Sequence, residues 1–425
     1  MKFVDLFAGL GGFHIALKKL GHDCVFACEI EENLRQHYLE NFNIYPDGDI
    51  TKIKLKSIPK HDILCAGFPC QPFSKAGFAN GFSHKIAGKM FFHLFKIIKY
   101  HKPQYLFLEN VPNLLSHDRG KTWKFMRKEI KKLGYEIDQK IISPIDFNIP
   151  QTRDRLYIVA RQKKLKNFKW PEKINSIPNL KNFLISNPKN IRKLTDNKKK
   201  LFNFWKKFLT KVPKKGYIPN PLWTMEFGAT YPFEKATPHS TKINALRKLK
   251  GSFGKNLQHK SKDEIFNSIP KYARGKFKKF PGWKIRMIKR SRDFYLKNKS
   301  WVDKLIPEIL NLEFEAYQKL EWNCQGEKFN LTKKIVSFRG SGVRIKRSIS
   351  SPTLIASSQT QIPYLPWKNR YLAHEECINI QGFKGIKSFP EASDKFYCTI
   401  GNAVNVGVVS RIAKNLFNLK NVSKR

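Results

Sequence analysis

Short apolar runs alternate with amphipathic stretches over the first 160 residues of the chain. Residues 2–7 have the pattern of a buried strand, a glycine-rich turn follows, and residues 13–20 have the apolar spacing of a helix that ends at Gly21. Further strand patterns lie at residues 24–30, 63–66, 105–108 and 156–160, with helical patterns at 31–42, 90–100 and 122–133. Strands that alternate with helices predict an α/β fold with a doubly wound, largely parallel sheet.

This alternation ends near Arg161. The chain continues with Lys, Asn, Pro and aromatic residues that have no clear period, and β-like signals return at residues 335–354. From about residue 370 the chain is again apolar and periodic, and residues 399–416 have the pattern of a strand, a turn and a helix. We therefore expect a second domain after the first α/β segment.

Composition narrows the class of protein. Of the 425 residues, 41% are hydrophobic and 27% charged, and no apolar run approaches the roughly 18 residues that a membrane span needs. The N-terminus has no apolar signal region, so we expect a soluble protein in the cytosol with no membrane partner. Seven cysteines without a CxxC pair argue against a disulfide framework and against a structural metal site.

The net charge of +48 points to a polyanionic partner. Residues 161–350 carry 47 basic and 13 acidic side chains, and therefore hold most of the excess. A lysine-rich surface produced by a biased genome composition is the alternative interpretation. Such a bias would not spare both ends of the chain, so a nucleic-acid-binding middle segment fits better.

The glycine-rich turn at residues 7–13, FAGLGGF, lies where an open parallel sheet binds nucleotide-like ligands. Glu29 follows Gly9 by 20 residues, which is the spacing of a carboxylate that binds the two hydroxyls of a ribose. Because the turn departs from GxGxxG, a ligand with a ribose but no pyrophosphate fits better, and S-adenosylmethionine is such a ligand. A plain tight turn, or the nucleotide site of a nicotinamide oxidoreductase, remains open on this motif alone.

Three further segments place reactive or charged side chains beside strand ends. Cys70 follows the strand at 63–66, where it is either a reactive thiol or a small buried side chain. Glu109 directly follows the strand at 105–108, where burying a carboxyl is costly unless it has a hydrogen-bond or ion-pair partner or a functional role. Alternate positions in Gln151–Arg155 would turn Arg153 and Arg155 to one face, toward a common anion or toward solvent.

Five motifs in this order resemble the DNA (cytosine-5)-methyltransferases of bacterial restriction–modification type. They are VDLFAGLGGF (4–13), DILCAGFPCQPFS (62–74), FLENV (107–111), QTRDRLYIVA (151–160) and GNAV (401–404). The resemblance implies a Rossmann-like catalytic domain at residues 1–165 and 365–425, dependent on S-adenosylmethionine. It also implies a smaller, β-rich, basic target-recognition domain at residues 166–364 that binds double-stranded DNA.

The resemblance also assigns the catalytic roles. Cys70 would attack carbon 6 of a flipped-out cytosine, and protonated Glu109 would donate to ring nitrogen 3, which activates carbon 5 toward the methyl group. Arg153 and Arg155 would hold the base carbonyl and steady the Cys70 loop. The implied cofactor residues are Phe7, Gly9, Leu10, Gly12, Glu29, Ile30, Asp49, Ile50, Pro69, Met90, Asn402 and Ala403, and Arg370, Glu376 and Gln381–Phe383 match a mainly structural motif.

Two positions depart from the family pattern. Ala87 stands where the family commonly has arginine, and His93 where a carboxylate is frequent, although Lys85 could supply the missing charge. A catalytically silent DNA-binding protein and an RNA cytosine methyltransferase therefore remain alternatives. We expect a monomer, and a cognate restriction endonuclease encoded nearby is a habit of the family.

Basic patches at residues 271–292 and 339–347 are candidates for contacts to phosphates or bases. We expect Trp283, Trp301 and Trp322 to fill the core of the inserted domain, because large aromatic side chains usually do.

Overall fold

The computed structural model describes residues 1–69, 87–165, 167–189, 191–214, 216–354 and 362–417. The chain divides into two compact units. The first consists of Met1–Asn190, Ile349–Gln359 and Ala373–Arg425, and the second of Ile191–Ser348 and Thr360–Leu372. N-terminal and C-terminal segments therefore build one unit together.

These boundaries differ from the expected ones at 165 and 365. Residues 167–189 belong to the first unit, because Ile174 N donates to Asp146 O at 2.9 Å and Ile185 N donates to the buried carboxylate of Glu376 at 2.9 Å. Residues 364–371 belong to the second unit, because Tyr364 pairs with Val336 in its sheet.

The first unit contains a six-stranded sheet with strand order β2-β1-β3-β4-β6-β5. Its strands are β1 (Lys2–Leu6), β2 (Asp23–Cys28), β3 (Ile63–Gly67), β4 (Tyr105–Asn110), β5 (Tyr135–Ile142) and β6 (Arg155–Gln162). Strands β1 to β4 pair in parallel, and β6 runs antiparallel to both β4 and β5. The predicted α/β sheet is confirmed, whereas β5 was missed because exposed Glu136, Asp138 and Lys140 interrupt its apolar pattern.

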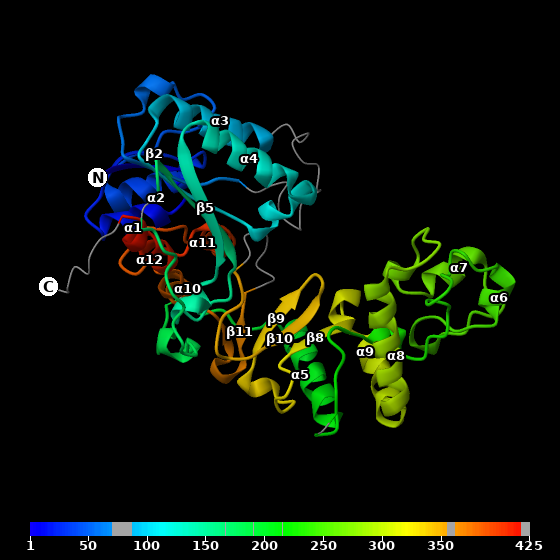
Figure 1. Ribbon diagram of the computed structural model, residues 1–425. Helices are drawn as coiled ribbons and strands as arrows, with labels where there is room; N and C mark the ends of the chain where they lie inside the picture. Colours follow the sequence, from blue (N-terminus) through cyan, green and yellow to red (C-terminus); the bar gives the residue numbers. More distant parts are fainter. Residues whose placement is uncertain (70–86, 166, 190, 215, 355–361, 418–425) are drawn as a thin grey trace. The chain divides into compact units, whose positions relative to one another are not determined.

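Helices cover both faces of this sheet, as Figure 1 shows. They are α1 (Gly12–Lys18), α2 (Glu32–Phe42), α3 (Ala87–His101), α4 (Lys121–Lys132), α10 (His374–Gln381), α11 (Ser393–Asn402) and α12 (Val406–Leu416). One core joins α3 and α4 to one sheet face through Leu94, Met126, Leu64, Leu106 and Leu108. On the other face, the ring of Phe13 on α1 packs against Phe107 of β4 at 5.1 Å. Both faces are therefore buried, as a doubly wound sheet requires.

The C-terminal segment departs from the prediction of a strand before its last helix. Helix α11 instead continues to Asn402, and α12 begins at Val406 with Asn405 as its cap, whose side chain accepts from Val408 N. Val404 lies between them, and a Cβ on Gly12 would come within 2.5 Å of its side chain. The glycine of α1 thus allows the C-terminal motif to pack against the first turn of the chain.

The second unit also contains a six-stranded sheet, with strand order β12-β11-β9-β10-β8-β7. Its strands are β7 (Leu222–Trp223), β8 (Lys319–Asn323), β9 (Ile335–Arg339), β10 (Gly342–Lys346), β11 (Tyr364–Leu365) and β12 (Arg370–Tyr371). It also contains the helices α5 (Asp196–Lys211), α6 (Ile243–Arg247), α7 (Lys262–Asn267), α8 (Gly282–Val302) and α9 (Ile306–Leu310). The expected β structure is present, but the sequence analysis missed these helices.

The three tryptophans expected in this core have different environments. Trp322 is fully buried, and Trp301 packs against the rings of Phe208 and Phe294. Trp283 is 53% exposed, so its assignment to the core was wrong. Within the described ranges, no helix combines the length and apolar character needed to cross a membrane.

Candidate active site

Polar side chains gather at one edge of the first sheet. Strands β1 to β4 end at this edge because they are parallel, and β6 begins there because it runs the opposite way. The edge therefore receives Glu29 after β2, Glu109 at the end of β4 and Arg155 at the start of β6. In open α/β sheets this is the edge at which ligands bind.

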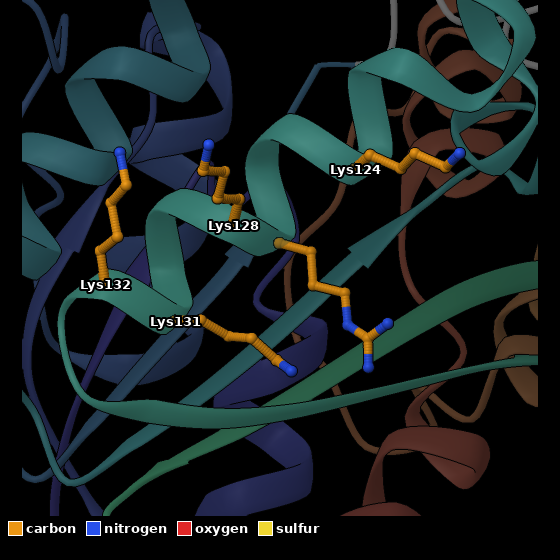
Figure 2. A pocket seen from close by; sticks show the side chains of 5 residues that line it. Lys124, Lys128, Lys131 and Lys132 are labelled. Atoms are coloured by element: carbon orange, nitrogen blue, oxygen red, sulfur yellow. The ribbon is translucent and has the colours of Figure 1, made fainter.

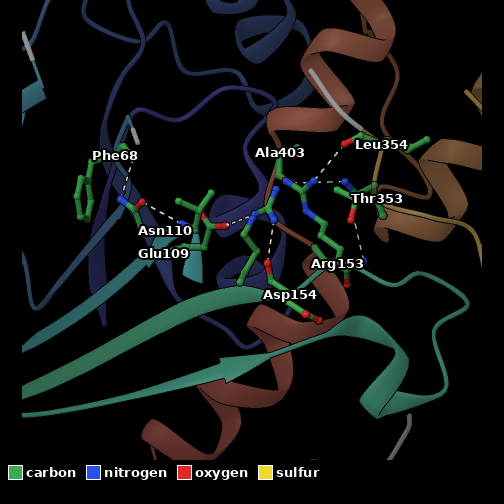
Figure 3. A network of polar contacts seen from close by, with 12 residues as sticks. Phe68, Glu109, Asn110, Arg153, Asp154, Thr353, Leu354 and Ala403 are labelled. Carbon is green, nitrogen blue, oxygen red and sulfur yellow. Dashed lines mark hydrogen bonds and ion pairs between the residues drawn. The ribbon is translucent and has the colours of Figure 1, made fainter. Parts of the chain in front are cut away.

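Glu109 and Arg155 form a close ion pair at this edge (Figure 3). Arg155 Nε lies 3.1 Å from Glu109 Oε1, and the side chains are only 17% and 9% exposed. Burial raises the pKa of Glu109, while the positive charges of Arg155 and then Arg153 oppose that rise. A carboxyl in this position is easier to protonate than one in water, which suits a proton donor.

Arg153 lies just before strand β6, and its side chain contacts main-chain carbonyls. Its main-chain N donates to Ser143 Oγ at 3.0 Å, and its buried guanidinium donates to the carbonyls of Leu354 at 3.4 Å and Ala403 at 3.0 Å (Figure 3). Strand β6 begins only at Arg155, so positions 151–154 precede the strand, but the charges of both Arg155 and Arg153 lie near enough to Glu109 to oppose the rise in its pKa. Arg153 thus binds main-chain carbonyls of two distant segments, while Arg155 faces the carboxylate.

Asn110 fixes the main chain that leads to Cys70. Its side chain is 2% exposed, and its Nδ2 donates to Phe68 O at 3.2 Å while its Oδ1 accepts from Val111 N at 2.9 Å. The strand that carries Glu109 therefore also holds the segment two residues before Cys70. No role was predicted for Asn110, and the one signal in the sequence is its place directly after Glu109.

Several predicted residues lie outside what the structure describes. Cys70 and Lys85 fall in the gap between residues 69 and 87, and for Ala87 only the helical backbone is described. His93 lies on α3, and its charge lowers the pKa of Asp49 as the smallest of several causes. His93 is therefore near Asp49, a residue expected at the cofactor.

Glu29 joins the glycine turn to the end of β2. Its Oε2 accepts from Gly9 N at 2.8 Å and its Oε1 from Glu31 N at 3.0 Å, and the side chain is 8% exposed. Burial raises the pKa of Glu29, and the main-chain donors oppose this. Gly9 has a φ of 53°, and a Cβ there would meet no atom of the described residues within 4 Å, so these residues leave open space beside the turn.

The segment with Asp49 and Ile50 lies beside Glu29, because Glu29 N donates to Asp47 O at 2.9 Å. The Asp49 carboxylate accepts from Thr51 N at 2.9 Å, and this bond lowers the pKa of Asp49. Ile30, next to Glu29, is 68% exposed and presents an apolar side chain beside this carboxylate.

The remaining cofactor candidates differ in exposure. Leu10, Gly12 and Ile50 are buried; Phe7, Met90 and Ala403 are half-buried; Pro69 and Asn402 are exposed. Ala403 touches the site through the carbonyl that Arg153 binds. The structure thus brings Gly9, Glu29 and the Asp49 segment together, and the buried residues support this surface by packing.

A family model of the C-5 cytosine-specific DNA methylases matches residues 1–418. The chain belongs to this family. The resemblance that the five motifs indicated is therefore confirmed, and it extends through the second unit.

Individual relatives named as Type II methyltransferases match a shorter part of the chain. The Type II methyltransferase M.DsaV of Dactylococcopsis salina is 48% identical over 164 residues, which is 39% of this chain and 46% of that protein. M.HhaI of Haemophilus parahaemolyticus is 42% identical over 174 residues, 40% of this chain and 53% of that protein. The chain spans about half the length of these relatives. The methyltransferase EhMeth of Entamoeba histolytica shares the fold, with a TM-score of 0.55, 17% identity and 99% of each chain covered.

The second unit of this methylase has two basic patches, at residues 271–292 and 339–347. They differ in how many of their cations are already paired with carboxylates. Arg339 and Arg344 both form ion pairs with Glu321, and Arg347 pairs with Glu327. Two carboxylates from outside the patch thus pair with three of its arginines, and Glu327 also pairs with Lys334, so the charge of the patch at 339–347 is only partly neutralised.

The patch at 271–292 has exposed cations with aromatic neighbours. Lys276, Lys278 and Lys279 are exposed beside Phe277, and Trp283 is exposed a few residues later. Exposed cations that alternate with aromatic rings are typical of nucleic-acid-binding surfaces.

Proposed function

We propose that this chain is a DNA (cytosine-5)-methyltransferase that transfers a methyl group from S-adenosylmethionine to carbon 5 of a cytosine flipped out of duplex DNA. The buried pair of Glu109 and Arg155 supports this proposal most directly. A carboxyl with a raised pKa, beside the segment that leads to Cys70, suits the donation of a proton to cytosine nitrogen 3.

The proposed reaction assigns one step to each side chain. The Cys70 thiolate forms a bond to ring carbon 6 while Glu109 protonates nitrogen 3, so that carbon 5 becomes nucleophilic enough to accept a methyl group. Transfer of the carbon 5 proton to water then expels the thiolate, and return of the nitrogen 3 proton to the Glu109 carboxylate restores the neutral aromatic ring. Arg155 keeps Glu109 in place, and Arg153 holds the segments of Leu354 and Ala403 around it.

The residues at the edge of the sheet fit S-adenosylmethionine, which supplies an electrophilic methyl group when bound. Glu29 offers a buried carboxylate to a ribose, Ile30 offers an exposed apolar surface to an adenine, and the space next to Gly9 admits the amino-acid end. Each oxygen of Glu29 already accepts one main-chain hydrogen bond, and its further lone pairs can accept from ribose hydroxyls.

The second unit is the proposed target-recognition domain. Its segment 271–292 supplies exposed lysines for phosphates and the rings of Phe277 and Trp283 for bases. We expect the protein to act on duplex DNA as a monomer. Since its relatives carry the name Type II methyltransferase, it would protect host DNA from a nuclease that cuts the same sequence.

The proposal is tested by bisulfite sequencing of unmethylated plasmid DNA after incubation with the protein and S-adenosylmethionine. Protected cytosines in one short sequence context, absent with Cys70→Ala, would support it and would reveal the target. Binding of DNA and cofactor without protected cytosines would favour a silent binding protein. Methylation of an RNA substrate but not of DNA would identify an RNA methyltransferase.

A further inference from the structure

Helix α4 carries a row of cations on its exposed side, outside the candidate active site. Figure 2 shows that the side chains of Lys124, Arg127, Lys128, Lys131 and Lys132 line a shallow hollow over this helix. All five are exposed. Lys124, Lys128 and Lys131 follow one another at the helical spacing that places side chains on the same face. We call these five residues the α4 cation row.

The α4 cation row is fixed in place by the opposite face of its helix. Trp123, Met126 and Ile130 are buried in the core that α4 shares with the sheet. These three apolar side chains of α4 are therefore not available to insert into a lipid surface, and the five residues of the row present their charges to a partner. A rigid row loses little conformational freedom of the main chain on binding.

The clustering of these cations is unfavourable for the helix itself. Lys124 and Lys128, Arg127 and Lys131, and Lys128 and Lys132 are like charges at i,i+4 positions, which destabilise a helix. The last two lysines also complement the negative end of the helix dipole, but the first three residues of the row do not. The one acidic residue of α4, Glu129, pairs with Lys132 at 2.7 Å and leaves the others unbalanced.

We propose that the α4 cation row binds phosphates of duplex DNA outside the target site, an inference that rests on DNA being the substrate. The five cations of the row span about 12 Å of helix, roughly two for each 5.4 Å turn, which suits a densely charged polyanion. Because α4 follows β4 in the chain, it starts at the edge of the sheet that holds Glu109 and runs away from it. DNA bound at the active site therefore lies close to the start of the row.

Exposed rings lie beside the same helix. Phe92 of α3 and Phe125 of α4 are 43% and 37% exposed, and their ring centroids are 6.1 Å apart. Lys96 and Lys99 follow on the exposed side of α3. Helices α3 and α4 lie on the same side of the sheet (Figure 1). Both helices thus carry exposed cations and exposed rings.

The test compares two charge-reversal variants of the whole chain. One changes Lys124, Lys128 and Lys131 to Glu. The control changes Lys54, Lys56 and Lys60 to Glu, three exposed lysines of the same unit in the segment before β3. The probe is a long duplex without cytosine, and its affinity is measured over a range of salt concentrations. Melting temperature and S-adenosylmethionine affinity show that both variants are folded.

We expect the α4 variant to lose affinity for the probe and to flatten the log–log salt slope by about 2.7, since each phosphate contact contributes about 0.9. The control should keep the wild-type slope. The inference would be overturned if the α4 variant and the wild type had equal salt slopes, or if both variants lost the same affinity for the probe. Tighter binding of an RNA duplex than of the DNA duplex would also overturn it. If the slope of the α4 variant is flattened but the wild-type protein transfers no methyl group, the proposed reaction is refuted and the DNA-binding surface on α4 is supported. If the wild-type protein transfers methyl groups but the α4 variant keeps the wild-type slope, the reaction is supported and the surface is refuted.

Discussion

Arg155 Nε lies 3.1 Å from Glu109 Oε1, and the topology of the sheet makes this contact. Strand β6 runs antiparallel to β4, so that Leu156 pairs with Asn110 and the first residue of β6 reaches the end of β4. Burial raises the pKa of Glu109, and Arg155 is the first of the two charges that oppose the rise. The protonation of Glu109 thus depends on a residue from another motif of the sequence.

The pair predicts how pH affects catalysis. If protonated Glu109 donates to the base, methyl transfer falls as pH rises through the pKa of Glu109. Arg155→Met removes the charge that holds this pKa down, so the fall should move to higher pH, with a lower maximal rate because Arg155 also positions the carboxyl. Single-turnover rates over a pH series measure both effects.

Two variants control this experiment. Arg161→Met removes a charge from the other end of β6 and should leave the pH profile unchanged. Glu109→Gln should abolish the fall together with most of the rate, since an amide cannot titrate. A profile that stays in place in Arg155→Met would show that Glu109 is not the titrating group.

The sequence predicted those parts of the site that depend on local patterns. Apolar runs located β1, β2, β3, β4 and β6, and the spacing from Gly9 to Glu29 located a contact that the structure contains. Glu109 and Arg155 were named from motifs whose strands become neighbours in the sheet.

The sequence did not predict features that depend on distant segments. Arg153 binds the carbonyls of Leu354 and Ala403, which lie about 200 and 250 residues further along the chain, so no local period reveals them. The expectation for Trp283 failed for a related reason. Residue type favours burial, but the place of Trp283 in the first turn of α8 leaves it 53% exposed.

Replacing Glu29 should weaken the binding of S-adenosylmethionine. Glu29→Gln keeps the shape of the side chain but loses the charge and places an amide N–H₂ against the main-chain donor of Gly9 or Glu31. We expect the dissociation constant to rise about 10- to 100-fold, which corresponds to roughly 1.5–3 kcal/mol for hydrogen bonds to a charged group. Titration calorimetry measures it. Glu31→Gln, an exposed neighbour, is the matched control, and equal affinities in all three proteins would exclude a ribose contact at Glu29.

A larger residue at position 12 should destabilise the fold, and a smaller one at position 404 should partly restore its stability. A Cβ on Gly12 would lie 2.5 Å from Val404 Cγ2 and 3.2 Å from Phe383 Cζ. Gly12→Ala should therefore reduce the free energy of unfolding by about 1–3 kcal/mol, the usual cost of overpacking. Adding Val404→Ala should restore part of this loss. Gly340→Ala, where a Cβ meets no atom within 4 Å, should be nearly neutral, and urea unfolding distinguishes the three variants.

The buried ring of His14 should make the free energy of unfolding fall at acidic pH. Its ring is 5% exposed, its Nδ1 is hydrogen-bonded to Tyr38 Oη at 2.8 Å, and it stacks on Phe42 at 4.1 Å. Burial, and then the charge of Lys18, lower the pKa of His14 to about 4. The unfolded chain takes up this proton near the usual pKa of about 6.5, whereas the folded chain takes it up only near 4. The stabilisation is therefore complete above pH 6.5 and is lost as pH falls toward 4.

The difference between wild type and His14→Phe isolates this effect from the buried carboxyl of Asp5, whose pKa burial raises. From pH 7 to pH 5 the free energy of unfolding of wild type should fall by about 2 kcal/mol more than that of His14→Phe, since phenylalanine binds no proton. Replacing the exposed His239 by Phe should leave the wild-type dependence unchanged. If wild type and His14→Phe lose stability equally, His14 is protonated in the folded protein, and its contact with Tyr38 then has His14 as the donor at acidic pH.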